Sequence, residues 1–554
     1  MTEVELKILP DPAALPALRR RLLRLAGRQG TRRRLRSIYL DTAEQGLATA
    51  GMALRLRAEA RRWTQTLKLG RSHRGGLSCA DEIDVDAPGG RLNLAALPQD
   101  AADAVRAAAG GLPLAPVFET RIERTHWTLA HAGARIEAAL DCGSIVAGGA
   151  SAPIDELELE RLEGDPGALF ALARALFPAG GWRLSTLNKA ERGARLGRGQ
   201  DPLPPPRVRR AQAPRIARDA TAEAAAVAIL DECQGMIAEN LAASTFAPPR
   251  PGADGHGGET HPKRGPLPQS EPQSEPQLQP DPEPDPEAPH QLRVGLRRLR
   301  AAVRLLRPAL GGSAATDARL AHLGAEAQWL AREVGRLRDL QVARDELVRP
   351  AAVATPAEPG FAVLIEALDA ETARAAAALR STLAGPRATA FQWDLAAYVA
   401  LWGWLDPADR GQTARLARPF RALAAQAARA AERRAAKRAK RIATLQHEAR
   451  HELRKALKML RYIVEFAAPA WPAKRVDAVL SPLKALQDLF GELNDAATAE
   501  ALFLAPDGPG AGSIDAARAA GRLIGQRTAA ADHAWRRARA RWAAFTAVKH
   551  PWAT

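Results

Sequence analysis

The amino-acid sequence predicts the α+β fold class, with a sheet-forming N-terminal part and an all-α C-terminal part. Over the first 200 residues, charged and apolar residues alternate in short runs with the period of β-strands. Helices are expected among these strands at Pro12–Gly27 and Gly167–Leu176. After Pro289 the chain is rich in Ala, Leu and Arg at helical spacing. Two proline-rich stretches separate the patterns, and proline cannot continue a helix.

The composition is that of a protein with packed cores. Of its 554 residues, 46% are hydrophobic, and the length suggests two to four domains of about 150 residues each. The three cysteines (Cys79, Cys142 and Cys233) form no CxxC pair, so we expect a cytoplasmic location without disulfides or a zinc knuckle. Apolar runs stay shorter than the roughly 18 residues of a membrane span, so no membrane partner is expected.

Shifts in composition predict the domain boundaries. We expect a first domain over residues 1–200, a proline-rich connector over 201–214 and a helical domain over 215–554. The segment 247–289 holds 13 prolines and repeated SEPQ and PDPE units. Such a segment cannot bury enough apolar surface to offset its ordering entropy, so it is predicted to be a disordered insertion in the helical domain.

The positive charge is concentrated in the helical part. The chain carries 79 Lys and Arg against 62 Asp and Glu, a formal net charge of +17. Residues 1–200 contribute 29 basic and 23 acidic residues, and residues 247–289 contribute 3 and 8. The rest of the chain holds 47 basic and 31 acidic residues, which indicates an anionic partner for the helical part.

Several predicted strands of the first domain place their charges on one face. In the run from Glu3 to Ile8 the residues Glu3, Glu5 and Lys7 share a face, because side chains alternate along a strand. The alternation recurs in four further runs: Leu54–Arg57, Thr64–Leu69, Glu82–Asp86 and Glu156–Glu160. A solvated sheet face is one interpretation. The clustering of like charges favours a second one, in which acidic and basic strands converge on one concavity.

Such a concavity would suit a phosphorylated substrate. Mg²⁺ and Mn²⁺ prefer oxygen ligands and commonly bridge carboxylates to substrate phosphates. Arg and Lys would hold the phosphate oxygens. The chain contains no GxxxxGK[ST] motif, so the pattern predicts phosphoryl-transfer chemistry without a P-loop.

The first 200 residues resemble the CYTH superfamily, the triphosphate tunnel enzymes. Glu3-x-Glu5-x-Lys7 is similar to the ExExK signature of that family. The resemblance continues in the family's order through Tyr39–Thr42, Leu54–Arg57, Thr66–Lys68, Arg124, Ile136–Asp141, Glu156–Glu160 and Ser185–Gly193. The chain as a whole resembles bacterial inorganic triphosphatases in which a helical domain follows CYTH.

This resemblance implies an antiparallel β-tunnel that hydrolyses a linear triphosphate with Mg²⁺ or Mn²⁺. It implies that six cations grip the phosphate oxygens: Lys7, Arg55, Arg57, Lys68, Arg124 and Lys189. It also implies one metal-binding set of Glu156, Glu158 and Glu160. A second set, Glu3 and Glu5, would hold another metal or place the attacking water. The expected catalytic residues are Glu3, Glu5 and Lys7.

Other residues of the first domain have less definite positions. The sequence leaves open whether Arg121 or Arg124 points into the tunnel. Three acidic residues are expected inside it without an assigned role: Glu82, Glu137 and Asp141.

The helical part contains an internal duplication. The segment His290-Gln-Leu-Arg-Val-Gly-Leu-Arg297 aligns without gaps with His451-Glu-Leu-Arg-Lys-Ala-Leu-Lys458. Downstream, a Gly-x-Leu-x-Asp match ends at Asp339 and Asp495, which lie 49 and 44 residues after the two His residues. Such self-similarity predicts two copies of a helical hairpin.

Each copy predicts a helix with a basic stripe. At about 100° per residue, a stripe about 80° wide contains His290, Arg293, Arg297, Arg300 and Arg304. The second stripe contains His447, His451, Arg454, Lys458 and Arg461. A solvated face is the simpler interpretation of one such helix. The repeated register favours a surface for a phosphate chain, because Arg binds phosphate bidentately and stays charged.

The duplicated His/Arg pattern resembles the CHAD domain, and this resemblance implies polyphosphate binding through both stripes. The predicted function is therefore metal-dependent hydrolysis of inorganic triphosphate or a similar linear triphosphate, with polyphosphate bound by the helical domain. A non-catalytic protein that binds or is targeted to polyphosphate is the alternative. Nucleic acid is not the expected partner, because aromatic residues make up only 5% and do not interleave with the stripes.

Overall fold

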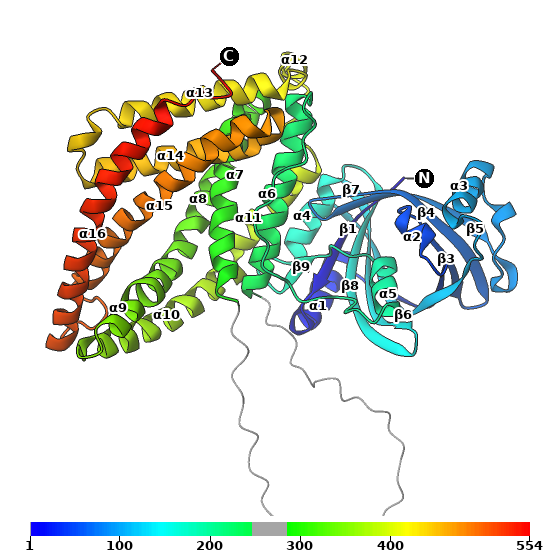
Figure 1. Cartoon of the computed structure of the whole chain (residues 1–554). Coiled ribbons are helices and arrows are strands. Elements are labelled where there is room, and N and C mark those ends of the chain that lie inside the picture. Colours follow the sequence, from blue (N-terminus) through cyan, green and yellow to red (C-terminus); the bar gives the residue numbers. More distant parts are fainter. Residues whose placement is uncertain (1, 246–284, 554) are drawn as a thin grey trace, which may run out of the picture.

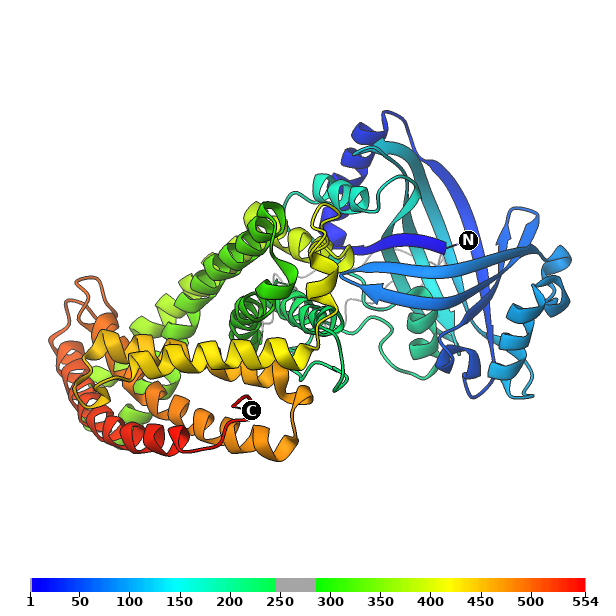
Figure 2. The same cartoon turned by 90° about the horizontal axis from the view of Figure 1, so that it is seen from above.

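The computed structural model of the chain describes residues 2–245 and 285–553. An antiparallel barrel and a helical domain lie side by side (Figures 1 and 2). The predicted α+β fold class, with the sheet first and the helices second, is confirmed.

Within residues 2–245, nine antiparallel strands form one sheet, in the order β5-β4-β3-β2-β6-β7-β8-β1-β9. A further pairing between β5 and β1 closes the sheet into an eight-stranded barrel, and β9 pairs with the end of β1. The strands are β1 (Thr2–Pro10), β2 (Thr31–Asp41), β3 (Ala53–Glu59), β4 (Arg62–Arg74), β5 (Leu77–Asp86), β6 (Ala115–His131), β7 (Ala134–Ala147), β8 (Ala150–Glu163) and β9 (Trp182–Leu184).

Short helices cover the outside of the barrel. They are α1 (Leu15–Ala26), α2 (Gly46–Thr49), α3 (Gln99–Ala109), α4 (Gly167–Leu176) and α5 (Lys189–Gly197). The two helices predicted in this region are confirmed as α1, preceded by a 3₁₀ turn over Pro12–Ala14, and α4. Apolar residues of both helices pack on the outward face of the strands, so the polar face is left for the interior.

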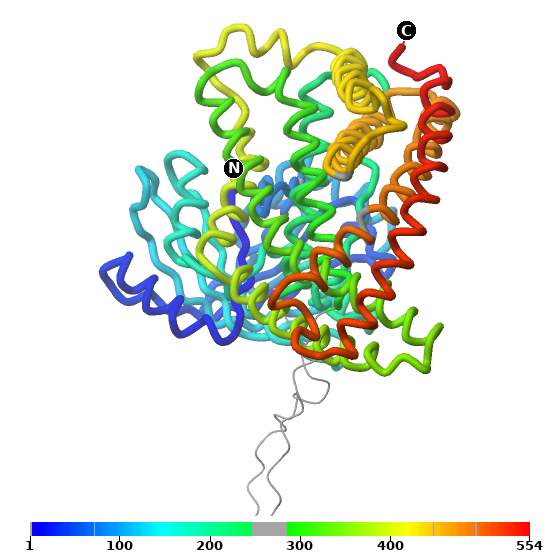
Figure 3. Tube along the Cα trace, turned by 90° about the vertical axis from the view of Figure 1, so that its left-hand side faces the viewer, coloured from blue at the N-terminus to red at the C-terminus, as the bar shows by residue number. Residues whose placement is uncertain are grey.

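The helical domain contains α6 (Ala222–Thr245), α7 (Glu287–Leu310), α8 (Ala314–Val342), α9 (Arg349–Ala354), α10 (Gly360–Ala384), α11 (Pro386–Ala400), α12 (Gln412–Leu416), α13 (Phe420–Arg438), α14 (His447–Ala467), α15 (Ala473–Phe503) and α16 (Ile514–Thr546). A π-helical segment, Ala343–Val348, joins α8 to α9. The last helix, α16, runs along α15 (Figures 1 and 3). Among the described helices, none combines the length and the apolar character that crossing a bilayer requires.

The duplicated unit corresponds to two pairs of helices, α7 with α8 and α14 with α15. In the first copy, Leu292, Leu296 and Leu299 are fully buried, and the basic stripe lies on another face of α7. The corresponding Leu453 and Leu457 are fully buried in α14. The leucine periodicity therefore fixes which way each basic stripe faces.

The predicted disorder of residues 247–289 lies largely outside the described residues. The prediction is wrong for the last three residues of this segment, Glu287–Pro289, because they form the start of α7. The Asp285 carboxylate accepts a hydrogen bond from the Glu287 N–H at 2.8 Å and so starts the helix. Pro289 lies in the first turn, where no intrahelical N–H bond is lost.

Candidate active site and basic cleft

The barrel encloses a polar cavity of about 280 Å³. All but one of the residues predicted to bind substrate or metal in the tunnel line it: Glu3, Glu5, Lys7, Arg55, Arg57, Lys68, Arg124, Glu158, Glu160 and Lys189. The strand alternation read from the sequence is thus an alternation between the inside and the outside of the barrel. On β1, for example, Leu6 and Ile8 are fully buried in the outer core.

The register of β1 brings its charges next to those of its neighbours. Glu5 lies opposite Glu160 and Lys7 opposite Glu158 on β8. The Lys7 Nζ atom is 2.7 Å from a Glu5 carboxylate oxygen and 2.8 Å from one of Glu158. The carboxylate of Glu3 pairs with Lys68 of β4. Each cation of this group therefore already contacts a carboxylate.

An ion network at one side of the cavity is centred on Lys189. Lys189 is the first residue of α5, and a capping box between Asn188 and Glu191 fixes this helix start. Its Nζ atom contacts three carboxylates at 2.6–2.9 Å: Asp141, Glu156 and Glu158. Arg124 binds both carboxylate oxygens of Asp141 at 2.7 Å each.

Glu156 is the exception among the residues predicted to bind substrate or metal. Its side chain is fully buried beside Lys189 and does not line the cavity. The N-terminal turn of α5 lies over this end of β8, so Lys189 takes the inward position that alternation gave to Glu156. The structure therefore places Glu156 behind Lys189 and leaves Glu158 and Glu160 facing the cavity.

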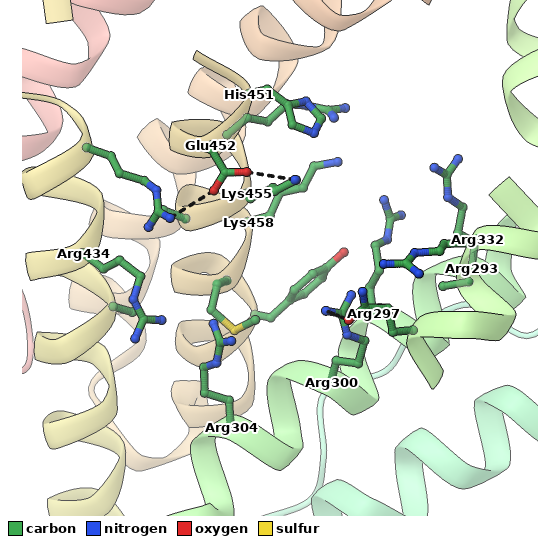
Figure 4. Close-up of a pocket in the computed structure, with 18 residues that line it drawn as sticks. Arg293, Arg297, Arg300, Arg304, Arg332, Arg434, His451, Glu452, Lys455 and Lys458 are labelled. Carbon is green, nitrogen blue, oxygen red and sulfur yellow. Dashed lines mark hydrogen bonds and ion pairs between the residues drawn. The ribbon is translucent and has the colours of Figure 1, made fainter. Parts of the chain in front are cut away.

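A second cavity of about 610 Å³ lies in the helical domain between α7, α8, α13 and α14 (Figure 4). This basic cleft is lined by seven residues of the predicted stripes: Arg293, Arg297, Arg300, Arg304, His451, Arg454 and Lys458. Four further basic residues line it, Arg332, Arg434, Arg438 and Lys455. The two copies of the duplicated unit thus face each other across one cleft.

Comparison with known families identifies the domains in which the two cavities lie. A CYTH domain model matches residues 1–194 and a CHAD domain model matches residues 274–504. The chain joins a CYTH domain to a CHAD domain. The tunnel cavity lies in the CYTH domain and the basic cleft in the CHAD domain.

Individual relatives cover parts of the chain. An inorganic triphosphatase from Haemophilus influenzae is 29% identical over 202 residues, 36% of this chain and 55% of that protein, so the chain spans about half of its length. Two solved structures are more distant. The CHAD domain of the plant Ricinus communis is 24% identical, with a TM-score of 0.46 over 62% of this chain and 98% of that one. A putative adenylyl cyclase from Hippeastrum with a dominant triphosphatase activity is 18% identical, with a TM-score of 0.27 over 37% of this chain and 98% of that one.

The pKa values of the carboxylates in the CYTH cavity are shifted in opposite directions. Burial opposes ionisation of Glu158, but Lys189, Lys7 and Arg124 hold its pKa well below the usual value. In contrast, burial and the neighbouring carboxylates raise the pKa of Glu3 to about 7. The same two causes raise the pKa of Glu160 to about 7. The ionised forms of Glu3 and Glu160 are therefore poorly stabilised by the positive charge around them.

These poorly stabilised carboxylates bear on whether the cavity fits the divalent metal that the family implies. In the described part of the chain, no group of three His, Cys, Asp or Glu side chains already converges on one point as a metal site. Mg²⁺ commonly takes only one or two carboxylates and completes its coordination with water and substrate phosphates. Glu3, Glu5 and Glu160 offer such oxygen donors in a site short of positive charge, so the donor set fits.

The positions left open by the sequence are resolved. Arg124 points into the cavity, whereas Arg121 is exposed and pairs with Glu119, because residues three apart on a strand face opposite sides. Asp141 is fully buried in the ion network, and Glu82 lines the cavity. Glu137 lies outside the cavity lining, 3.4 Å from His126.

Tyr39 is a cavity residue to which the sequence assigned no role. Burial opposes ionisation of its hydroxyl, but Arg55 and Arg57 lower its pKa. Burial, together with Arg55 and Arg124, lowers the pKa of Arg57 to about 10. The strand pattern alone does not reveal Tyr39, because an aromatic ring at this spacing is equally typical of a core.

Two described residues of the predicted stripes, His290 and Arg461, are not part of the cleft lining. His290 lies in the first turn of α7, where burial and Arg338 lower its pKa. Arg461 bonds Glu465 at 3.3 Å and lies over the Tyr462 ring. The side chain of His447 lies outside the described residues. The sequence did not predict Arg434 and Arg438, although a basic run, RRAAKRAKR, begins in α13, because this helix is not part of the internal duplication.

The basic cleft is short of negative charge. Among its lining residues, only Glu452 is acidic, and it is bound to Arg438 at 3.0 Å and Lys455 at 2.9 Å. Burial and the surrounding guanidinium groups, first Arg454 and then Arg297, lower the pKa of Lys458 to about 6. The CHAD cleft therefore holds like charges together that an anion would stabilise.

We predict that Lys189→Met destabilises the CYTH domain by roughly 3–5 kcal/mol, because it removes the cation that three buried carboxylates share and leaves Glu156 without its close partner. The loss should be smaller at pH 5 than at pH 8. Glu156, whose pKa burial raises, can take up a proton as the pH falls and relieve the repulsion. Urea unfolding at both pH values measures the change, with the exposed Lys474→Met as control. Equal losses for the two variants would contradict the assignment of the network.

Proposed function

We propose that the CYTH domain hydrolyses inorganic triphosphate, or a similar linear triphosphate, with Mg²⁺ or Mn²⁺, and that the CHAD domain binds polyphosphate. The observation that carries the proposal is the arrangement of charge in the tunnel. The closed barrel contains a cavity of about 280 Å³, in which cations able to bind a phosphate chain lie beside carboxylates that lack sufficient counter-charge. The Haemophilus influenzae relative is itself an inorganic triphosphatase, which supports the proposal.

In the proposed reaction, the cations bind and orient the triphosphate. Arg55, Arg57 and Arg124 would neutralise its oxygens, and Lys7, Lys68 and Lys189 would exchange carboxylate partners for phosphate. A metal held by one or two of the carboxylates of Glu3, Glu5 and Glu160, together with water and substrate phosphate, would supply further charge neutralisation and a more acidic water. Phosphoryl transfer depends mainly on positioning and charge stabilisation, which a preformed polar tunnel provides.

The wider assignments follow from the same proposal. The CYTH domain would end near residue 200, and residues 201–214 would serve as the connector, since they form neither helix nor strand. The three free cysteines accord with a cytoplasmic location. Because the cleft is charged and carries few aromatic side chains, a phosphate chain suits it better than stacked bases.

The tunnel is tested by turnover. We predict that the purified protein with Mg²⁺ or Mn²⁺ releases phosphate from inorganic triphosphate faster than from ATP. Glu5→Gln should lower the rate by about 100-fold or more, because it removes a charge that faces the bound ion. Glu123→Gln, an exposed residue on β6, is the matched control. No turnover on either substrate would refute the enzyme and leave the alternative, a non-catalytic polyphosphate-binding protein.

The cleft is tested by charge removal. Replacing Arg293, Arg297, Arg454 and Lys458 together by Ala should abolish tight binding of polyphosphate to the full chain in the absence of metal. A control variant loses four exposed charges of α16 instead: Arg536, Arg537, Arg539 and Arg541. Wild-type binding should be stronger for polyphosphate than for DNA of equal charge and should weaken steeply with salt. Similar affinities of the two variants would show that the cleft is not the binding site.

Lys458 makes polyphosphate binding dependent on pH. With a pKa of about 6 it is mostly neutral at pH 7.5, and a bound polyanion favours its charged form. Binding should therefore take up a proton, and affinity should increase as the pH falls from 8 towards 6. Titration calorimetry in two buffers of different ionisation enthalpy measures the proton. Lys458→Met should remove this uptake, and an unchanged uptake in that variant would assign it to another group.

A further inference from the structure

The predicted catalytic strand β1 depends on two neighbours near its ends. At the closing seam, Thr2–Leu6 of β1 pair with Leu77–Asp81 of β5. At the other end, Ile8–Pro10 pair with Trp182–Leu184 of β9. Since Glu3, Glu5 and Lys7 lie between or within these pairings, the placement of both neighbours fixes their positions in the cavity.

Both neighbours of β1 rest on one helix of the CHAD domain, α11. The Trp182 ring of β9 stacks on Trp393 of α11, with ring centroids 3.6 Å apart and planes inclined by 9°. The tip of the β4–β5 hairpin lies against the C-terminal half of the same helix. A Cβ atom on Gly75, at that tip, would lie 2.4 Å from the backbone oxygen of Ala396.

Further contacts hold the hairpin tip in place. Arg74 lies 3.4 Å from Asp231 of α6 and places its guanidinium group over the Trp402 ring at 5.7 Å. On the inner side, the tip packs on β9, because a Cβ atom on Gly76 would meet the Leu184 side chain at 2.5 Å. The hairpin, β9 and the CHAD helices therefore form one packed layer.

The same layer completes the core behind the catalytic strand. Leu6 and Ile8 alternate with Glu5 and Lys7, and their side chains pack in one cluster with Trp393 and Ala396. Trp393 is fully buried in this cluster. A helix more than 180 residues after the barrel thus supplies part of the surface against which β1 rests.

We infer that α11 of the CHAD domain is a positioning element for β1, and through it for Glu3, Glu5 and Lys7 in the proposed reaction. This inference rests on the proposed function of the tunnel. It assigns to the CHAD domain a second role, independent of the basic cleft, which lies between other helices.

Two glycine variants test the inference. Gly75→Ala cannot dock on α11 without a clash, and its backbone φ of +56° is unfavourable for Ala. Gly148, in the β7–β8 turn, has the same φ of +56°, but its Cβ position is open space. Gly148→Ala therefore matches the backbone strain without disturbing any docking.

The measurements are steady-state kinetics on triphosphate and amide hydrogen exchange of the full chain. In Gly75→Ala, kcat should fall at least about fivefold, and the amides of β1 should exchange at least about tenfold faster. Exchange in α14, on the cleft, should stay unchanged. In Gly148→Ala, all of these quantities should stay within about twofold of the wild type.

A milder variant keeps the test valid if Gly75→Ala does not fold. Trp402→Ala removes the ring under Arg74 from a partly exposed position, and it should change kcat and β1 exchange in the same direction by less. The inference is overturned if Gly75→Ala and Trp402→Ala behave like Gly148→Ala. If wild-type protein shows no turnover but Gly75→Ala still accelerates β1 exchange, the proposed reaction fails while the dependence of β1 on α11 holds.

Discussion

The need to neutralise charge inside a closed barrel governs this structure. Isolated charges cannot be buried without a partner, and the CYTH domain buries many of both signs. Lys189 answers this constraint by contacting Asp141, Glu156 and Glu158 at once. Because Lys189 starts α5, a single capped helix end holds the charges of two strands. The barrel can then keep a polar interior that would otherwise collapse or fill with apolar side chains.

The two cavities use opposite balances of charge. In the tunnel, nearly every cation already contacts a carboxylate. A bound phosphate chain would replace the carboxylates as partner of these cations, and a metal would replace the cations as partner of the carboxylates. In the cleft, the cations of α7, α8, α13 and α14 face one another with a single acidic residue among them. The paired charges of the tunnel favour a ligand that fits their geometry, whereas the unbalanced positive charge of the cleft attracts anions in general. Both arrangements agree with a phosphate-rich ligand.

Strand and helix periodicity predicted many residues of both sites, because each period fixes which residues share a face. Arg124 and Lys189 of the tunnel were predicted from the resemblance to the CYTH superfamily. Periodicity could not place Glu156, since the turn that covers it comes from α5, far along the chain. The choice between Arg121 and Arg124 required the register of β6, which no local pattern encodes. Arg332, Arg434 and Arg438 were missed for a related reason. They reach the cleft from helices outside the compared stripes, and only the packing of the helices brings them there.

The contribution of Trp393 and Ala396 to the core behind β1 also has a consequence for biosynthesis. The ribosome completes the barrel sequence well before it makes α11. At about 5–20 residues per second, the intervening residues take roughly 10–40 seconds to emerge. During that interval the nascent barrel would present the apolar surface around Trp182 without its cover. The order of the chain therefore sets a window in which a chaperone, or the growing helices themselves, must shield that surface.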